Sequence, residues 1–136
     1  MIGLVLVTHG SLASELRKAA EHVVGPMNGM ETVCIGPDDD LEFARDSIRA
    51  AVNEVDDGGG VILLTDMFGG TPSNLAISLL KENKVEVLAG ANLPMLIKLS
   101  EARETAALSE AAQIAKTAGR RYIAIASQII AGDTDE

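Results

Sequence analysis

The strongest constraint on the fold of this chain is an alternation of short aliphatic runs with longer segments of helical period. The runs IGLVLV, VILLT and YIAIA are apolar throughout, which is typical of parallel strands whose two faces are both covered by helices. This pattern predicts a single α/β domain with an open, mainly parallel sheet. Strands are predicted at 2–7, 32–35, 60–65, 85–89 and 122–126.

Helices are predicted between these strands, where apolar residues recur with a period near 3.6. The first helix spans 12–24. The second has Asp39 as its N-cap, and the third has Thr71 as its N-cap with Pro72 at its first helical position. Two more helices are predicted at 94–102 and 108–118.

Length and charge limit what the chain can bind. Its 136 residues suffice for one domain with its own core, predicted at 1–130 and followed by an acidic tail at 131–136. The net charge is −9, and the aromatic residues are one tyrosine and two phenylalanines. Both observations argue against binding to nucleic acids, and the charge also argues against anionic membranes.

Cys34 is the single cysteine, which excludes an internal disulfide and a multi-cysteine zinc site. Because its neighbours are apolar, we expect it in the core. The N-terminus lacks the charged region and the cleavage site of a signal peptide, and no apolar run is long enough to cross a membrane. We therefore expect a cytoplasmic protein without direct membrane insertion.

The rules for connecting strands bring two polar residues to one edge of the sheet. Right-handed crossovers with helices on both faces predict the strand order 2-1-3-4, in which the chain reverses direction between the first and third strands. Ligands in such sheets bind beyond the carboxyl ends of the strands at this reversal. His9 ends the first strand and Asp66 ends the third, so we expect them to face each other across one crevice.

A carboxylate beside an imidazole gives that ring a defined chemical role. If Asp66 accepts a hydrogen bond from Nδ1–H of His9, the tautomer is fixed and Nε2 keeps the free lone pair of a nucleophile. Each residue also has a purely structural alternative. His9 could be a satisfied polar group at a strand end, and Asp66 could be a turn former that hydrogen-bonds to its own loop.

Two predicted helices begin beside this pair and supply hydrogen-bond donors for an anion. Gly10 and Ser11 precede the first helix, and the third begins at Gly69-Gly70-Thr71. Unpaired N–H groups at helix starts bind phosphate, glycines let the backbone approach closely, and hydroxyls add donors. The hydroxyls of Ser11 and Thr71 have an alternative role, the capping of their own helices.

The segments VTHGSLA, TDMFGGTPSNLA and LAGANLPML, in this order, resemble the IIA component of the mannose/fructose-type family of the bacterial phosphoenolpyruvate-dependent phosphotransferase system. The resemblance covers about 1–127. It implies a phosphotransferase that works through a phosphohistidine: a phosphocarrier that takes a phosphoryl group from the carrier protein HPr and passes it to a IIB component for sugar uptake. It places the phosphorylated nitrogen at Nε2 of His9.

The resemblance also assigns roles to the residues around His9. It implies that Asp66 orients the ring and that Thr71, with neighbouring amides, holds the phosphoryl group. Phe68 stands where family members often have tryptophan. Met67 and Phe68 therefore form either an apolar rim that docks partners or a part of the core. The resemblance implies a wall of the site made of Asn92, Leu93 and Pro94.

The resemblance extends to partners and assembly. Mannose-type members are frequently fused to a IIB domain through a flexible linker. This sequence shows neither, so we expect the acceptor IIB to be a separate protein or to be absent. Members commonly form homodimers in which the last strand, 122–126, joins the partner's sheet antiparallel to the rest. The residues alone leave the direction of this edge strand open. No cofactor or metal is expected, because the mouth of the site carries no carboxylate cluster that resembles a magnesium site.

Other functions use the same residues. In a regulatory alternative, phosphorylation of His9 controls binding to another enzyme or sensor, and no sugar permease is involved. A flavodoxin-like nucleotide binder is disfavoured because the G-x-G-x-x-G fingerprint is missing after the first strand. A phosphate donor for a dihydroxyacetone kinase is expected to carry further donor domains.

Overall fold

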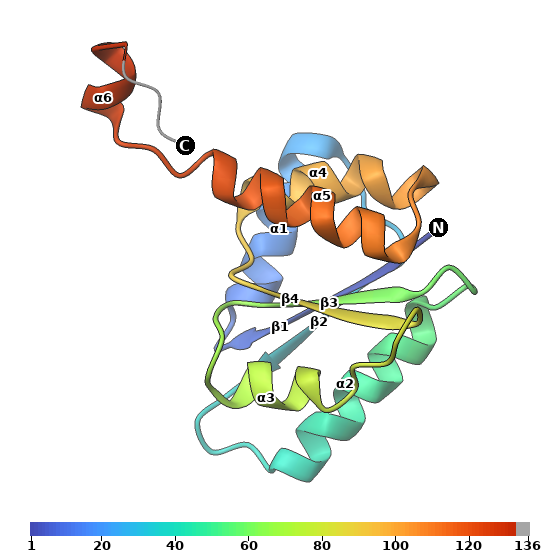
Figure 1. The fold of residues 1–136 in the computed structure, drawn as a ribbon. Helices are drawn as coiled ribbons and strands as arrows, with labels where there is room; N and C mark the ends of the chain where they lie inside the picture. Colours follow the sequence, from blue (N-terminus) through green and yellow to red (C-terminus); the bar gives the residue numbers. More distant parts are fainter. Residues whose placement is uncertain (133–136) are drawn as a thin grey trace.

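Four parallel strands form one open sheet in the computed structural model, which describes residues 1–132 (Figure 1). They are β1 (Gly3–His9), β2 (Met30–Ile35), β3 (Val61–Thr65) and β4 (Val85–Ala89). Their order across the sheet is β2-β1-β3-β4, which confirms the predicted order and the single α/β domain. The central strands β1 and β3 are buried except at His9, because a continuously apolar strand is covered on both faces.

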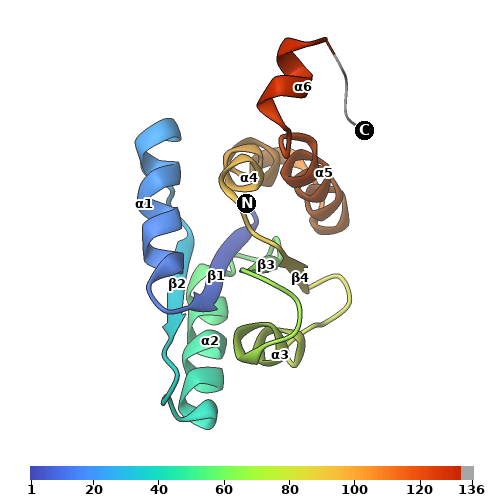
Figure 2. The same ribbon diagram turned by 90° about the vertical axis from the view of Figure 1, so that its left-hand side faces the viewer.

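Three helices cover one face of the sheet. They are α1 (Leu12–Val24), α4 (Leu93–Thr105) and α5 (Leu108–Arg121). Their buried side chains pack with alternate residues of the central strands, among them Leu6 and Leu64, in one apolar cluster. Within this layer α1 packs against α4, and α4 packs against α5 (Figure 2). An early helix and two late helices therefore share one side of the sheet.

Two helices, α2 (Leu41–Val55) and α3 (Thr71–Ile77), cover the other face. Their starts differ from the prediction. Asp40, not Asp39, is the N-cap of α2: its side chain accepts a hydrogen bond from the Glu42 N–H at 3.1 Å. The carboxylate of Asp39 is already engaged by the Gly36 N–H at 2.8 Å, so it does not cap the helix.

The predicted last strand does not form within the described residues. Helix α5 runs through Arg121, beyond its predicted end, and 122–125 join no strand of the sheet. A short helix, α6 (Ala126–Ile130), follows. This C-terminal arm, defined here as 122–130, projects away from the body (Figure 1). A strand needs a hydrogen-bonding neighbour, and the arm leaves α5 in a direction that gives it none among the residues that the structure describes.

Cys34 is exposed, so its predicted place in the core is wrong. It lies in β2, which is an edge strand and is therefore less completely covered than β1 or β3. Its sulfur lies 3.4 Å from the Ser14 hydroxyl.

A buried arginine fixes α4 to the amino ends of the strands. The Arg103 side chain is 3% exposed, and it donates hydrogen bonds to the carbonyl oxygens of Ile2 and Gly29, each at 2.9 Å. Burial lowers the pKa of Arg103, because the charged form is held away from water. The carbonyl contacts compensate part of that cost and tie the late helix to the first strand.

The ends of the described chain add two observations. Within residues 1–132, no helix combines the length and the apolar character needed to cross a bilayer. Most of the acidic tail predicted at 131–136 lies outside the described residues.

Candidate active site

The carboxyl ends of β1 and β3 bring His9 and Asp66 into contact. His9 Nδ1 lies 2.8 Å from Asp66 Oδ2, and the backbone N–H of His9 donates to the same oxygen at 3.1 Å. The two residues are 57 positions apart in sequence, so the parallel pairing of β1 with β3 creates the contact. Figure 2 looks onto this edge of the sheet.

The two side chains differ in their access to solvent. The His9 ring is 52% exposed, whereas the Asp66 side chain is 13% exposed. The carboxylate is therefore sheltered at the base of the site, and the ring is open to an incoming partner.

The electrostatics of Asp66 determine the tautomer of His9. Burial by itself would raise the pKa of Asp66, but hydrogen bonds from the His9 ring and from backbone N–H groups, with attraction to the ring, lower it overall. The carboxylate is thus ionised at neutral pH and can only accept hydrogen bonds. Nδ1 of a neutral His9 ring must carry the proton in this contact, and the lone pair is left on Nε2.

The glycine loop after β3 lies directly beside Nε2. A Cβ atom built on Gly70 would lie 3.1 Å from Cε1 and 3.3 Å from Nε2 of His9, and the φ angle of Gly70 is +144°. Only glycine combines this backbone conformation with this closeness to the ring. Gly69, with a φ angle of +74°, has no atom within 4 Å of such a Cβ and so faces open space.

The helix starts are arranged differently from the prediction. Thr71 is the first residue of α3, and Gly70 is its N-cap, so the hydroxyl of Thr71 does not cap the helix. Ser11 is the N-cap of α1 but makes no side-chain capping bond. Instead, the hydroxyl of Thr8 accepts the Ala13 N–H at 2.7 Å and takes up one of the donors at the start of α1. Gly10, with a φ angle of +55°, connects β1 to this helix start.

The predicted wall residues lie at the start of α4. The Asn92 side chain caps α4 by accepting the Met95 N–H at 3.1 Å, and it donates to the Gly119 carbonyl at 2.9 Å. Its amide is thus used to join α4 to α5, and no hydrogen bond connects it to His9. Leu93 and Pro94 are half-buried in the first turn of α4.

The side chains of Met67 and Phe68 are exposed by 53% and 69%. They are therefore not core residues, and the core alternative is wrong. Phe68 and Asn92 both line a groove of about 620 Å³ that runs between the free edge of β4 and α5. This groove places an apolar rim beside the candidate site.

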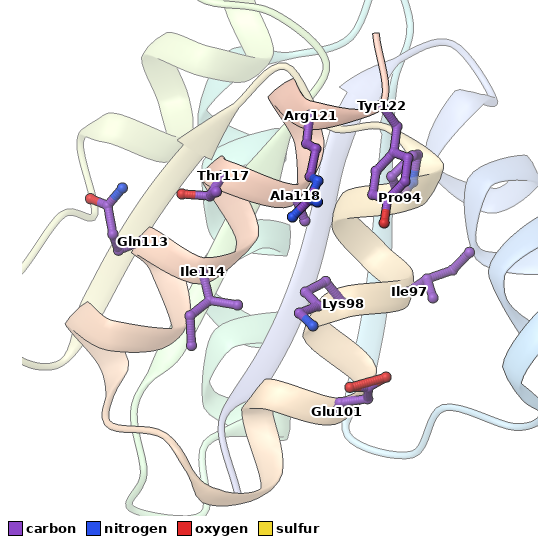
Figure 3. A pocket seen from close by; sticks show the side chains of 10 residues that line it. All are labelled: Pro94, Ile97, Lys98, Glu101, Gln113, Ile114, Thr117, Ala118, Arg121 and Tyr122. Atoms are coloured by element: carbon purple, nitrogen blue, oxygen red, sulfur yellow. The ribbon is translucent and has the colours of Figure 1, made fainter. Parts of the chain in front are cut away.

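A separate groove of about 600 Å³ lies between α4 and α5 (Figure 3). Its lining includes Ile97, Ile114 and the aliphatic stems of Lys98 and Arg121. Of the predicted site residues only Pro94 borders it, so it does not belong to the candidate active site.

The sequence pattern did not point to two polar residues that flank Asp66 and its glycine loop along the chain. Thr65 and Ser73 are fully buried, and their hydroxyls have no hydrogen-bond partner within residues 1–132. Two features of the sequence could have identified them. Thr65 is a hydroxyl residue at the end of the otherwise aliphatic run VILLT, and Ser73 lies one helical turn before Ala76, a buried residue of α3. Within residues 1–132, no group of three or more His, Cys, Asp or Glu residues is placed so that it could hold a metal ion.

Comparisons with known proteins agree on one family. The family model described as PTS system fructose IIA component matches residues 3–116. The mannose-specific EIIAB component of Escherichia coli K12 is 33% identical over 104 residues, which are 76% of this chain and 32% of that protein. The chain thus spans about a third of the length of that relative.

Two further relatives match over most of their length. The fructose-specific EIIA component of Bacillus subtilis is 26% identical over 129 residues, covering 94% of this chain and 88% of that protein. The crystal structure of the PTS IIA protein associated with the fucose utilization operon of Streptococcus pneumoniae superimposes with a TM-score of 0.81 at 27% identity. That similarity covers 93% of this chain and 95% of the other.

Proposed function

Because the chain belongs to the family of PTS system fructose IIA components, we propose that it is a phosphocarrier whose His9 Nε2 accepts a phosphoryl group from HPr and passes it to a separate IIB component. The observation that carries this proposal is the contact of 2.8 Å between His9 Nδ1 and Asp66 Oδ2, which leaves Nε2 as the nucleophilic nitrogen. The exposed ring suits a group that must meet two protein partners in turn.

The chemical step is an in-line phosphoryl transfer between nitrogen atoms of two proteins. The lone pair of Nε2 forms the new N–P bond, while the bond from phosphorus to the donor nitrogen breaks and its electron pair returns to the donor. The His9 ring becomes more positive as the bond forms, and the ionised Asp66 stabilises that charge through Nδ1–H. No proton has to leave Nδ1. Transfer to the acceptor reverses the same step.

The phosphoryl oxygens are proposed to lie against the starts of α1 and α3. The backbone N–H groups of Gly69, Gly70 and Thr71 and the Thr71 hydroxyl form one side of this cradle, and Gly10 with Ser11 forms the other. The two hydroxyls are free of capping bonds, which supports this role. A cradle of neutral donors suits a carrier, because very tight binding of the phosphorylated state would prevent release.

Met67 and Phe68 are proposed to dock the protein partners. They are exposed in the loop between Asp66 and Gly70, which both lie close to the His9 ring. This supports the role, because large apolar side chains exposed near a functional site commonly mark interaction surfaces. Asn92, Leu93 and Pro94 are proposed to wall the site indirectly, by holding the start of α4 beside the groove that Phe68 lines.

A reconstitution experiment tests the proposal. The purified chain is mixed with phosphoenolpyruvate, Enzyme I and HPr, and its intact mass is recorded. We expect an adduct of one phosphoryl group that is lost in acid, as phosphohistidine requires. Addition of a candidate IIB component then discharges it; a chain that stays loaded with every IIB tested would favour the regulatory alternative. Absence of any adduct in the presence of active HPr would refute the carrier function.

Replacing Gly70 with alanine should slow phosphoryl uptake by about tenfold, because the new methyl group crowds Nε2 and displaces the ring from its reacting position. The strained backbone should also cost about 1–3 kcal/mol of stability. The measurement is the initial rate of adduct formation, combined with urea unfolding.

Gly69→Ala is the matched control for this substitution. It imposes a similar backbone strain at a φ angle of +74°, but its methyl group faces open space. Stability should fall in both variants, whereas the rate should fall strongly only in Gly70→Ala. Equal rates in the two variants would contradict the close approach of the loop to Nε2.

The C-terminal arm is proposed to join a second copy in a homodimer. The arm exposes large apolar side chains, with Ile123 exposed by 70% and Ile125 by 57%, and the edge of β4 is free in the same chain. A chain truncated after Arg121 should therefore sediment as a monomer, and the full chain as a dimer. A variant truncated after Ile125 keeps the extended segment and should remain a dimer if strand pairing holds the copies together. A full chain that is monomeric at micromolar concentration would exclude this assembly.

A further inference from the structure

Three buried polar atoms without a hydrogen-bond partner belong to one short stretch of the chain, from the end of β3 to the first turn of α3. They are Thr65 Oγ1, Asp66 Oδ1 and Ser73 Oγ, and they are the buried side-chain oxygen or nitrogen atoms of residues 1–132 that lack a partner. Thr65 and Ser73 are 0% exposed. Buried polar groups in folded proteins are nearly always hydrogen-bonded, so three within nine residues need an explanation.

The fold places the two hydroxyls in the same layer. Leu63 belongs to the apolar cluster beneath α2 and α3, and Thr65, two residues further along the strand, points to the same face. On α3, Ala76 belongs to that cluster, and Ser73 precedes it by one turn on the same buried stripe. Both hydroxyls therefore face the layer between the end of β3 and the first turn of α3, and Asp66 directly follows Thr65.

A single water molecule has enough donors and acceptors to bond to all three atoms. A buried water makes about two to four hydrogen bonds and acts as both donor and acceptor, whereas an ionised carboxylate only accepts. We infer that a buried water bridges Thr65, Asp66 and Ser73, and that Thr65 and Ser73 are positioning residues for the Asp66–His9 pair. The importance of this water for activity rests on the proposed function of His9.

The water acts on the oxygen of Asp66 that His9 does not use. Oδ2 accepts from both the ring and the backbone of His9, and Oδ1 is left to accept from the water. A fixed Oδ1 keeps the carboxylate from rotating, so Oδ2 stays aligned with Nδ1–H and the ring stays in place. Thr65 and Ser73 are uncharged, and His9 is the ionisable group whose charge acts on Asp66.

The test removes each hydroxyl and follows the carboxyl titration of Asp66 by NMR. Thr65→Val and Ser73→Ala should each raise the pKa of Asp66, because the charged form loses a hydrogen bond. The double variant should show a smaller shift than the sum of the two, since both substitutions release the same water. Phosphoryl uptake should slow by about tenfold, the lower end of what lost outer hydrogen bonds cost at metal sites.

Ser100→Ala is the matched control. Its hydroxyl donates to the Ile97 carbonyl at 2.6 Å within α4, and its loss should leave both the Asp66 titration and the rate unchanged. The inference is overturned if Thr65→Val and Ser73→Ala leave the titration unchanged and resist urea better than the parent chain. Removal of hydroxyls that truly lack a partner would give that result.

A high-resolution crystal structure of the unmodified chain covers the case in which the variants fail to fold. Density for one water within hydrogen-bond distance of all three oxygens supports the inference, and its absence there overturns it. Neither the titration nor the crystal structure depends on phosphoryl transfer. If the unmodified chain accepts no phosphoryl group, the proposed function fails, and the water site is still decided by these two measurements.

Discussion

Replacement of His9 with alanine is expected to abolish the acid-labile phosphoryl adduct completely. The proposed acceptor is one nitrogen atom, and no other residue within 1–132 has an imidazole held by a carboxylate. The His9 ring is half-exposed, so its removal should leave the fold intact, which circular dichroism and urea unfolding can verify. Intact-mass measurement after incubation with phosphoenolpyruvate, Enzyme I and HPr gives the result directly.

The second histidine of the chain is the matched control. His22 is exposed in α1, and its ring forms no ion pair with a carboxylate of residues 1–132. His22→Ala should therefore accept the phosphoryl group at the parental rate. If His9→Ala still forms the adduct and His22→Ala does not, the phosphoryl acceptor lies at the other end of α1, and the proposed role of His9 is refuted.

Replacement of Asp66 with alanine is expected to slow phosphoryl uptake by about 10²-fold while leaving some activity, because the nucleophile remains but loses its orientation. Without the carboxylate, the proton is no longer held on Nδ1, and the ring gains a second tautomer and more freedom to rotate. Nitrogen NMR of the His9 ring should show this directly as a mixture of tautomers where the parent has one. A normal rate together with a single tautomer would refute the orienting role.

Asp57→Ala is the control for the loss of a hydrogen-bonded aspartate. Asp57 lies before β3, near the amino ends of the strands and opposite to the end that carries His9. Its carboxylate pairs there with the N-terminal ammonium group at 3.3 Å. Phosphoryl uptake should be unchanged in that variant. A similar slowing in both variants would mean that the Asp66 effect reports general destabilisation.

The lowered pKa of Asp66 adds a prediction of sign to the same variant. An acid whose pKa is lower in the folded state stabilises the fold above its unfolded pKa, and that contribution is lost as the pH falls through the folded pKa. Asp66→Ala should therefore differ most from the parent in stability near neutral pH. The difference should shrink in acid, which urea unfolding at a series of pH values measures.

Much of the fold was predictable because the buried strands are encoded locally. The aliphatic runs that become β1 and β3 lie at the centre of the sheet, where both faces are covered, so their composition alone identifies them. Strand order followed from the handedness of crossovers, and order placed the ends of β1 and β3 side by side. Topology alone therefore predicted where on the sheet the candidate site lies.

The errors occurred where a local pattern has two outcomes. An apolar segment such as 122–126 becomes a strand only if a neighbour offers hydrogen bonds, and residues 1–132 offer none there. Cys34 has apolar neighbours, but its strand is at an edge. Asp39 and Asp40 are the same residue type at adjacent positions, so sequence cannot tell which of them caps α2. The hydrogen bond from the Gly36 N–H to the Asp39 carboxylate leaves Asp40 as the cap.

By itself, the sequence determined the class of fold and the residues at the carboxyl ends of β1 and β3, among them the imidazole that is the candidate nucleophile. Each of these depends on composition, on periodicity and on how the strands are connected. The tertiary structure alone decided how close His9 and Asp66 lie, that Gly70 rests against the ring, and that the hydroxyls of Thr65 and Ser73 are buried without a partner within residues 1–132. These facts depend on contacts between segments far apart in the chain or on the exact path of a loop. No local pattern encodes such distances, since they result from packing the whole domain.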